Sequence, residues 1–313
     1  MSDKIITVGL SPCWDRTIEI DGVNWGQHKI ISSQKISPAG KSLNINKALA
    51  WLGVESFAMG LWGSEDYKQM RETTAGLRNF IKINFTKAKG STRKNITIID
   101  TANKRQMHLR GRSTLANEES LKRLNKDLQK ITKHSFCIFA GAMPQGKLLN
   151  KTISLIESVK KKGAAVVIDT SGPALKKIVA KGGLCIIKPN VEELGELAGR
   201  KIKNEKNAIV SAARKFLNKT KFVLVSRAEK GAILIGKEYV LSARYKGKAY
   251  DVYNTVGCGD FLMAGFISCF CPRKDNAKRA LEMGVKTATA KAFGFNRAIA
   301  REVLVKSKCS SCK

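Results

Sequence analysis

The chain has 313 residues, of which 43% are hydrophobic and 26% charged, a balance typical of a globular protein with a large buried core. No apolar run approaches the length of a membrane span and the polar start is unlike a secretory signal, so we expect a cytoplasmic protein with no membrane partner. The formal net charge of +32 is extreme, but the basic residues are spread along the whole sequence. We therefore expect a surface that favours anionic substrates and binds nucleic acid only nonspecifically.

Apolar, β-rich runs alternate with longer amphipathic stretches along the sequence. The predicted strands, in chain order, are 5–10, 136–140, 165–169, 184–188 and 222–226. The predicted helices are 42–52, 117–132, 148–162, 191–198, 207–218, 260–271 and 276–292. Nearly continuous apolar strands between helices predict a parallel sheet that is covered on both faces and binds ligands at the carboxyl ends of its strands.

Four short segments depart from this rhythm, because they alternate apolar and polar residues as antiparallel strands with one solvated face do. These segments are 16–21, 30–36, 94–100 and 105–110. Residues 102–104 form a plausible turn between the last two. We therefore expect a single domain over 1–313 with a small β lid, its strands drawn from about 16–36 and 93–110. Exposed strand edges can pair, so a homodimer through the lid is a further expectation.

The most informative segment is 254–266, in which two glycines flank Cys258 and Asp260 follows at once. Glycine lets the backbone turn several N–H groups inward, and a helix that begins there adds unpaired N–H groups and the positive end of its dipole. Such an anion cradle with a carboxylate at its edge suits phosphoryl transfer. On spacing alone, a turn in which Asp260 only caps the helix is an equally good interpretation.

Two other motifs are rejected. Residues 141–147 spell most of a Walker A loop, but Leu148 has no hydroxyl for Mg²⁺ and Pro144 has no N–H for a phosphate. The eight cysteines are scattered, as free thiols in a reducing compartment are. Cys309 and Cys312 form an isolated CxxC, which is a weak zinc signal and is better interpreted as part of a polar tail.

Five segments together resemble the ribokinase/phosphofructokinase-B (pfkB) family of sugar kinases. Residues 254–266 resemble its C-terminal signature and residues 38–47 its N-terminal Gly-Gly-Lys-Gly-Ile-Asn-Val signature. Residues 188–193 are similar to its Lys-Pro-Asn-x-x-Glu segment, and residues 140–146 to its Ser-Gly-Ser-Leu-Pro-Pro-Gly segment. Residues 7–22 resemble the start of the 1-phosphofructokinase and tagatose-6-phosphate kinase branch. The segments occur in the family's order and span nearly the whole chain.

The resemblance implies a ribokinase-like three-layer αβα sandwich with a mostly parallel central sheet and a β-sheet lid. It implies ATP and Mg²⁺ as cofactors and a ketohexose phosphate as acceptor, with D-fructose 1-phosphate, converted into fructose 1,6-bisphosphate, the leading expectation. The alternatives are a tagatose-6-phosphate or fructose-6-phosphate kinase, a kinase of an unphosphorylated sugar or nucleoside, and a non-catalytic member that binds a sugar phosphate or nucleic acid.

The resemblance also implies roles for the residues that match its motifs. It makes Asp260 the catalytic base. It assigns the anion hole to the N–H groups of Gly257, Cys258 and Gly259. It assigns the sugar hydroxyls to Asp15, the sugar site to Gly40, Lys41 and Asn44, and the acceptor's phosphate to Arg93. It assigns ATP and Mg²⁺ to Lys188, Asn190, Glu193, Ser226 and Gly231, with Glu193 acting on the metal indirectly.

Each role has a structural alternative: Asp15 in a turn, Lys41 and Arg93 as surface charges, Glu193 as an ordinary first-turn acid of a helix. The sequence also departs from the family pattern near the expected site. The departures are Ala39, Ser42, Ala142, Arg227-Ala228, Cys258 and Phe261. We expect them to affect the identity of the acceptor more than the reaction.

Overall fold

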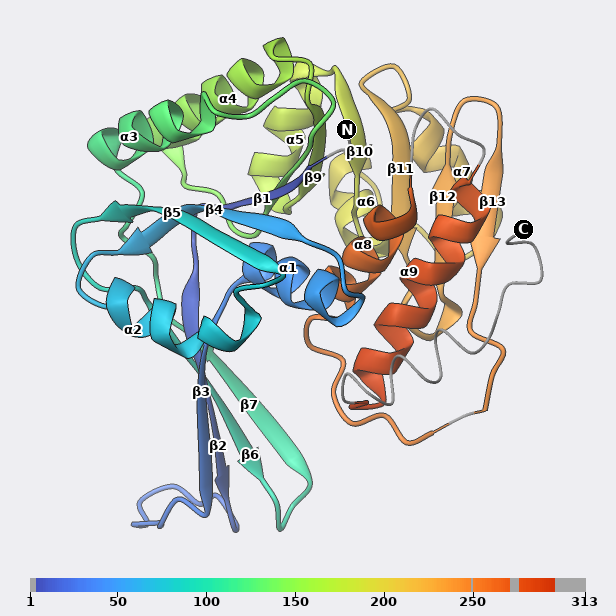
Figure 1. Cartoon of the computed structure of the whole chain (residues 1–313). Coiled ribbons are helices and arrows are strands. Elements are labelled where there is room, and N and C mark those ends of the chain that lie inside the picture. Colours follow the sequence, from blue (N-terminus) through green and yellow to red (C-terminus); the bar gives the residue numbers. More distant parts are fainter. Residues whose placement is uncertain (1–3, 249, 271–275, 296–313) are drawn as a thin grey trace.

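A nine-stranded sheet lies at the centre of the molecule (Figure 1). The computed structural model describes residues 4–248, 250–270 and 276–295. The strand order is β13-β12-β11-β10-β9-β8-β1-β4-β5, parallel from β11 to β5, with β12 and β13 antiparallel at one edge. The strands are β1 (Ile5–Gly9), β4 (Ser56–Gly63), β5 (Ile81–Ala88), β8 (Phe136–Ala140), β9 (Ala165–Asp169), β10 (Leu184–Ile187), β11 (Thr220–Ser226), β12 (Ala232–Ile235) and β13 (Val240–Ala243). The expected parallel sheet is confirmed, although β4, β5, β12 and β13 were not predicted.

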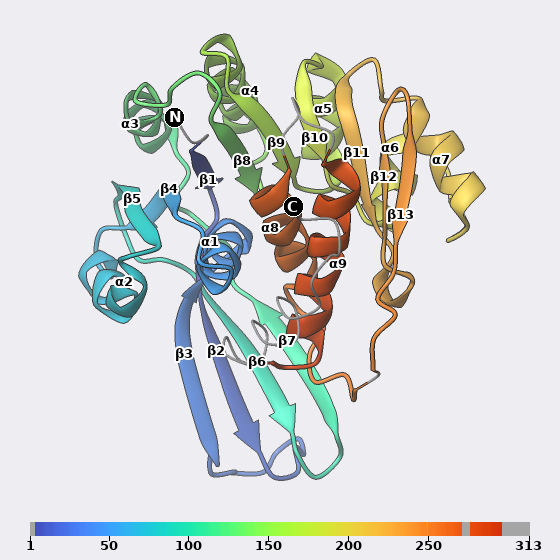
Figure 2. The same cartoon turned by 45° about the vertical axis from the view of Figure 1, so that its right-hand side comes forward.

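Helices cover both faces of this sheet and complete three layers (Figures 1 and 2). One face packs against α3 (Glu118–Leu128), α4 (Gly146–Lys161), α5 (Gly172–Lys181), α6 (Val191–Ala198) and α7 (Lys206–Arg214). The other packs against α1 (Lys41–Trp51), α8 (Cys258–Cys269) and α9 (Ala277–Ala292). Shorter helices are α2 (Tyr67–Thr73), η1 (Ala75–Leu77) and η2 (Ala228–Lys230). None of the helices among the described residues is both long and apolar enough to cross a membrane.

Strand β8 shows why a central strand can be apolar at every position. Side chains alternate along a strand, so Cys137 and Phe139 enter the core beneath α3–α7, while Ile138 and Ala140 enter the core beneath α1 and α8. All four are buried, because a parallel strand inside a three-layer sandwich has no face that meets water. The apolar runs therefore identified the strands at the centre of the sheet.

Helices α8 and α9 pack closely at two glycines. A Cβ at Gly265 would lie 2.7 Å from the carbonyl oxygen of Met283, and a Cβ at Gly284 would lie 2.8 Å from that of Leu262. Neither distance leaves room for a side chain, so the two backbones approach at positions that only glycine allows. This contact fixes the axis of α8, and with it the position of the helix start at Cys258.

The lid is a four-stranded sheet that projects from one side of the molecule in both views (Figures 1 and 2). Its strands are β2 (Cys13–Ile20), β3 (Ser33–Ala39), β6 (Lys94–Asp100) and β7 (Arg105–Arg110), in the order β3-β2-β6-β7. The outer pairs are antiparallel as expected, but the central pair, β2 with β6, is parallel. The chain returns to the main domain between β3 and β6, so β6 enters the lid from the same end as β2.

Candidate active site

Two predicted site residues, Lys188 and Ser226, and one further carboxylate, Asp169, lie at the carboxyl ends of β9, β10 and β11. Asp169 ends β9, Lys188 directly follows β10, and Ser226 ends β11. A parallel sheet leaves its loops and helix N-termini at this edge, and ligands of open α/β sheets bind there. The lid and the start of α8 contribute the remaining residues.

Asp260 is held at the start of α8 but does not cap it. The N-cap residue is Gly257, whose φ of 83° lies in the left-handed region, and no side chain caps the helix. Asp260 occupies the third helical position with only 4% of its surface exposed. Its Oδ2 accepts a hydrogen bond from Nδ2 of Asn44, at 2.9 Å. The interpretation of Asp260 as a helix cap is therefore wrong.

Two of the three N–H groups predicted for the anion hole have no acceptor within the described part of the chain. The N–H of Cys258 donates to the carbonyl oxygen of Thr255 at 3.2 Å, within the turn that precedes α8. Those of Gly257 and Gly259 donate to no described residue. Burial raises the pKa of the Cys258 thiol, so this cysteine is not an activated nucleophile. The available donors beside Asp260 are thus Gly257 and Gly259.

Asp169 belongs to the site although the sequence did not identify it. It is completely buried, and its Oδ1 lies 3.0 Å from Nζ of Lys41 and 3.3 Å from Nζ of Lys188. Its Oδ2 has no hydrogen-bond partner among the described residues. The available signal was its position, because a carboxylate directly after a buried parallel strand faces the ligand edge of the sheet.

These charges shift one another's pKa values. Burial raises the pKa of Asp260 to about 7, and the nearby charge of Asp169 acts in the same direction. The Asn44 hydrogen bond and the cations Lys41 and Lys188 oppose that rise. The pKa of Lys41 is raised, chiefly by Asp169, with further contributions from Asp260 and Glu193. Lys41 therefore stays cationic, while Asp260 exchanges its proton near neutral pH.

On the lid, Asp15 lies in β2 with one carboxylate oxygen occupied. Its Oδ1 accepts a hydrogen bond from Nδ2 of Asn95 at 2.9 Å and one from Sγ of Cys13 at 3.2 Å. Its Oδ2 accepts none from a described residue. Asp15 is thus a strand residue rather than a turn residue, with an oxygen left for a ligand.

Arg93 lies at the base of the lid, and its guanidinium donates mainly to backbone carbonyl oxygens. Its Nε donates to the carbonyl of Pro12 at 3.2 Å and its Nη2 to that of Ser11 at 3.2 Å. Its Nη1 donates to the carbonyl of Gly111 at 2.8 Å and to Oδ1 of Asn95 at 3.2 Å. A guanidinium has five N–H donors. Four of them donate to described residues, so one N–H of Nη2 has no acceptor among these residues.

At the start of α6, Asn190 and Glu193 bind each other. The backbone N–H of Asn190 donates to Oε2 of Glu193 at 2.8 Å, and that of Glu193 donates to Oδ1 of Asn190 at 2.7 Å. This capping box starts α6, so Glu193 has the first-turn role of the structural alternative. Asn190 also pairs with Ser226 as an isolated β-bridge. Gly231 is required by its turn, because a Cβ there would lie 2.1 Å from the carbonyl oxygen of Ala243.

Two departures from the family pattern have a structural explanation. Ser42 is buried against β1, where a Cβ on Gly9 would lie 2.0 Å from its Oγ, so this serine faces the sheet. Nε of Arg227 donates to Oδ1 of Asn204 at 2.9 Å, which fastens the loop before η2. Ala228, the next residue, has a φ of 50°.

Gly40, by contrast, keeps the glycine of the family pattern. Its φ is 114°, and a Cβ there would lie 3.2 Å from Cα of Pro12.

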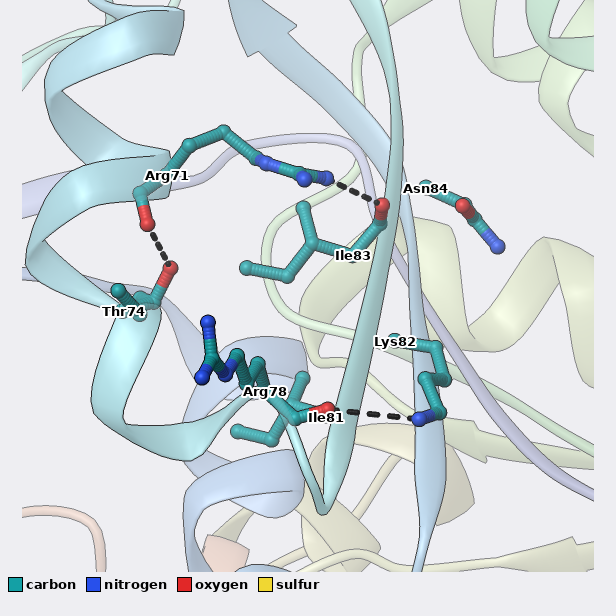
Figure 3. Close-up of a pocket in the computed structure, with 8 residues that line it drawn as sticks. Arg71, Thr74, Arg78, Ile81, Lys82, Ile83 and Asn84 are labelled. Atoms are coloured by element: carbon teal, nitrogen blue, oxygen red, sulfur yellow. Dashed lines mark hydrogen bonds between the residues drawn. The ribbon is translucent and has the colours of Figure 1, made fainter.

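A separate cavity of about 400 Å³ lies between α2, η1 and β5 (Figure 3). Its lining includes Arg71, Arg78 and Lys82 and none of the predicted site residues. Nη1 of Arg71 donates to the carbonyl oxygen of Ile83 at 3.3 Å, as the dashed line in Figure 3 shows. Because β5 is the last strand of the sheet, Arg71 covers an exposed strand edge.

A three-layer sandwich with a buried carboxylate at a helix start, two lysines nearby and adjacent N–H groups that donate to no described residue is typical of a small-molecule kinase. The family model described as "pfkB family carbohydrate kinase" matches residues 9–296, and the chain belongs to this family. The resemblance, the ribokinase-like fold and the carbohydrate-kinase class are thereby confirmed, and family membership implies ATP as the phosphoryl donor.

Curated relatives carry two related names. The chain is 28% identical to the 1-phosphofructokinase of Bacillus subtilis over 92% of each chain. It is 26% identical to the tagatose-6-phosphate kinase of Staphylococcus epidermidis over 84% of each chain. Among solved structures, the tetrameric inhibited form of phosphofructokinase-2 from Escherichia coli superimposes with a TM-score of 0.89, at 22% identity, over 98% of this chain and 100% of that one. That likeness confirms the fold.

Proposed function

We propose that this protein transfers the γ-phosphoryl group of ATP to a hydroxyl of a ketohexose phosphate, with D-fructose 1-phosphate as the leading acceptor. The observation that carries the proposal is the buried Asp260, oriented by Asn44 beside the unpaired N–H groups of Gly257 and Gly259. The names of the relatives, 1-phosphofructokinase and tagatose-6-phosphate kinase, support the acceptor class.

In this mechanism Asp260 accepts the proton of the 6-hydroxyl while the hydroxyl oxygen attacks the γ-phosphorus. The bond between that phosphorus and the β–γ bridging oxygen breaks, and ADP leaves with the electron pair. The N–H groups of Gly257 and Gly259 and the ammonium of Lys41 stabilise the charge on the transferred group. Lys188 is also near, since a Cβ on Gly259 would lie 3.3 Å from its Nζ.

Mg²⁺ would accompany the nucleotide and screen the charge of its phosphates. No group of three or more His, Cys, Asp or Glu side chains among the described residues is arranged as a metal cage. The carboxylate of Glu193 is engaged in its capping box. Such a donor set fits an ion that takes most of its ligands from water and phosphate, with Asn190 and Glu193 in the outer positions.

The acceptor would bind under the lid. Oδ2 of Asp15 is open to a sugar hydroxyl, and Arg93 keeps one N–H for the phosphate already on the sugar. A charge-assisted hydrogen bond from guanidinium to phosphate is stronger than one between neutral groups. Gly40 brings the backbone close to the sugar site, because no side chain intervenes there.

We further propose a homodimer through the apolar face of the lid. Strand register places two rows on this face, Ile36, Arg16, Ile96 and Leu109 in one and Gln34, Ile18, Ile98 and Met107 in the next. Ile36, Leu109 and Met107 are 48%, 46% and 46% exposed in the single chain. Exposed apolar side chains gathered on one face mark an interaction site, and a second copy offers a matching face.

The test of the proposed reaction is ATP-dependent turnover over a panel of fructose 1-phosphate, fructose 6-phosphate, tagatose 6-phosphate, fructose and a nucleoside. We expect the highest kcat/KM with fructose 1-phosphate. The variant Asp260→Asn should lose about 10²-fold or more in kcat and still bind ATP. Arg93→Ala should raise KM for the sugar phosphate far more than for ATP.

Each alternative has its own result in this panel. A preference for fructose or the nucleoside would show that the acceptor is not phosphorylated. A preference for another sugar phosphate would show that the acceptor is not fructose 1-phosphate. Binding of sugar phosphate or nucleic acid without turnover would identify a non-catalytic protein. Near-normal turnover of Asp260→Asn would remove Asp260 as the base.

A further inference from the structure

The side chain of Asn95 touches both residues proposed to bind the acceptor. Asn95 lies in β6, beside Asp15 of β2 in the parallel pairing at the centre of the lid. Its Oδ1 accepts a hydrogen bond from Nη1 of Arg93 at 3.2 Å. Its Nδ2 donates to Oδ1 of Asp15 at 2.9 Å and lies 3.1 Å from Sγ of Cys13. One amide thus connects an anion and a cation.

We propose that Asn95 is a positioning residue that holds Asp15 and Arg93 apart and in fixed orientation for a phosphorylated sugar. The proposal rests on the proposed function, because that function assigns Asp15 to the hydroxyls and Arg93 to the phosphate. Asn95 itself contacts no reacting atom in this mechanism.

The chemistry requires an amide at this position. An amide offers a donor and an acceptor at once, whereas a carboxylate only accepts and a hydrocarbon does neither. Without Asn95, the charges of Asp15 and Arg93 attract each other, and a direct ion pair would use the free oxygen of Asp15 and the last N–H of Arg93. The amide satisfies one oxygen and one N–H and leaves the others for the substrate.

The backbone around Arg93 makes Asn95 the decisive contact. The carbonyl of Arg93 accepts a hydrogen bond from the N–H of Trp14 at 2.8 Å. Asp66 accepts one from the N–H of Thr92 at 2.8 Å and another from Nε1 of Trp14 at 3.0 Å. The main chain is therefore fixed, and Asn95 is the one side-chain acceptor for Arg93 among the described residues.

The experiment compares Asn95→Asp, Asn95→Leu and a matched control, Thr97→Val, with the parent enzyme. Thr97 is two residues further along β6, so it lies on the same face of the lid. For each protein, kcat and KM are measured for sugar phosphate and for ATP at pH 6 and pH 8 and divided by the parent's values at the same pH. Melting temperatures identify variants that are not folded.

At pH 8 both Asn95 variants should lose about tenfold or more in kcat/KM for the sugar phosphate, because each breaks a partly buried hydrogen bond to a charged group. KM for ATP and the Thr97→Val enzyme should stay close to the parent. At pH 6 Asn95→Asp should recover several-fold relative to the parent, because two adjacent carboxyl groups share a proton and the protonated one donates as the amide does. Asn95→Leu has no such group and should not recover.

A purely structural role would lower the melting temperature and affect both substrates alike, without recovery at pH 6. That result, or an Asn95→Asp enzyme with unchanged sugar-phosphate kinetics at pH 8, would overturn the proposal. Asn95→Asp alone decides the question where Asn95→Leu does not fold, since it replaces only an NH₂ group. Absence of turnover in the parent would instead overturn the proposed function, so the two failures are distinct.

Discussion

Asn44 and Asp260 lie 216 positions apart in the sequence and are joined by a hydrogen bond of 2.9 Å. Asn44 belongs to the first turn of α1, which directly follows lid strand β3, and Asp260 belongs to the first turn of α8. The bond fixes the orientation of this buried carboxylate. It leaves Oδ1 of Asp260 for the proton that the proposed reaction transfers, and it joins the starts of α1 and α8.

The acid limb of the pH profile should report Asp260. Its pKa is raised to about 7, and a general base must be unprotonated, so kcat/KM should fall below that pH and level off above it. Asp169 contributes to the rise, so Asp169→Asn should move the limb to lower pH. The phosphate of the free substrate titrates identically in both experiments, so it cannot cause a difference between the two pH profiles. A limb that stays in place in Asp169→Asn would contradict this assignment.

As pH rises, ionisation of Asp260 should lower the stability of the fold while it raises the activity. Its folded pKa lies above the unfolded value of about 4, so the folded state binds more protons between these values and loses stability as pH rises through this window. Asp260→Asn carries no such charge. The melting temperature of the variant minus that of the parent should therefore be larger at pH 8 than at pH 5. Asp251→Asn, at an exposed position, is the control and should show no such difference.

Ala228 is in a conformation that disfavours a side chain. Its φ of 50° is left-handed, a region that costs an L-residue about 1–2 kcal/mol and glycine almost nothing. Ala228→Gly should therefore stabilise the fold by up to about 1 kcal/mol after the greater entropy of an unfolded glycine is counted. Thermal unfolding measures this effect. Ala208→Gly, inside α7, should have the opposite sign, and a loss of stability in both would refute the explanation.

The lid interface should be sensitive to charge on one face only. Leu109→Lys places an ammonium on the apolar face and should shift the protein to monomers in sedimentation equilibrium. Gln106→Lys adds the same charge to the same strand on the opposite face and should leave the assembly intact. An unchanged dimer in Leu109→Lys, or a monomeric parent, would exclude this face as the interface.

Predictions from the sequence were most successful where a short segment determines its own conformation. Residues 257–260 turn and start a helix because glycine allows the required φ, and Asn190 and Glu193 form a capping box at the predicted helix start. The apolar strands at the centre of the sheet were found because most of their side chains are buried. Strand β4 was missed although it is almost wholly buried, since its run contains Gly60, which has a φ of 117°.

The sequence by itself determined the fold class, the helix start that carries the proposed base and the segments that gather around it, because these depend on local backbone preference and on periodic burial. Only the tertiary structure decided how the charges are paired. Asp169 reaches Lys41 across 128 positions, and Asn95 reaches Asp15 across 80. Strand order and register create these contacts, and neither can be read from the residues themselves. The pKa of the base and the orientation of the proposed acceptor site follow from them.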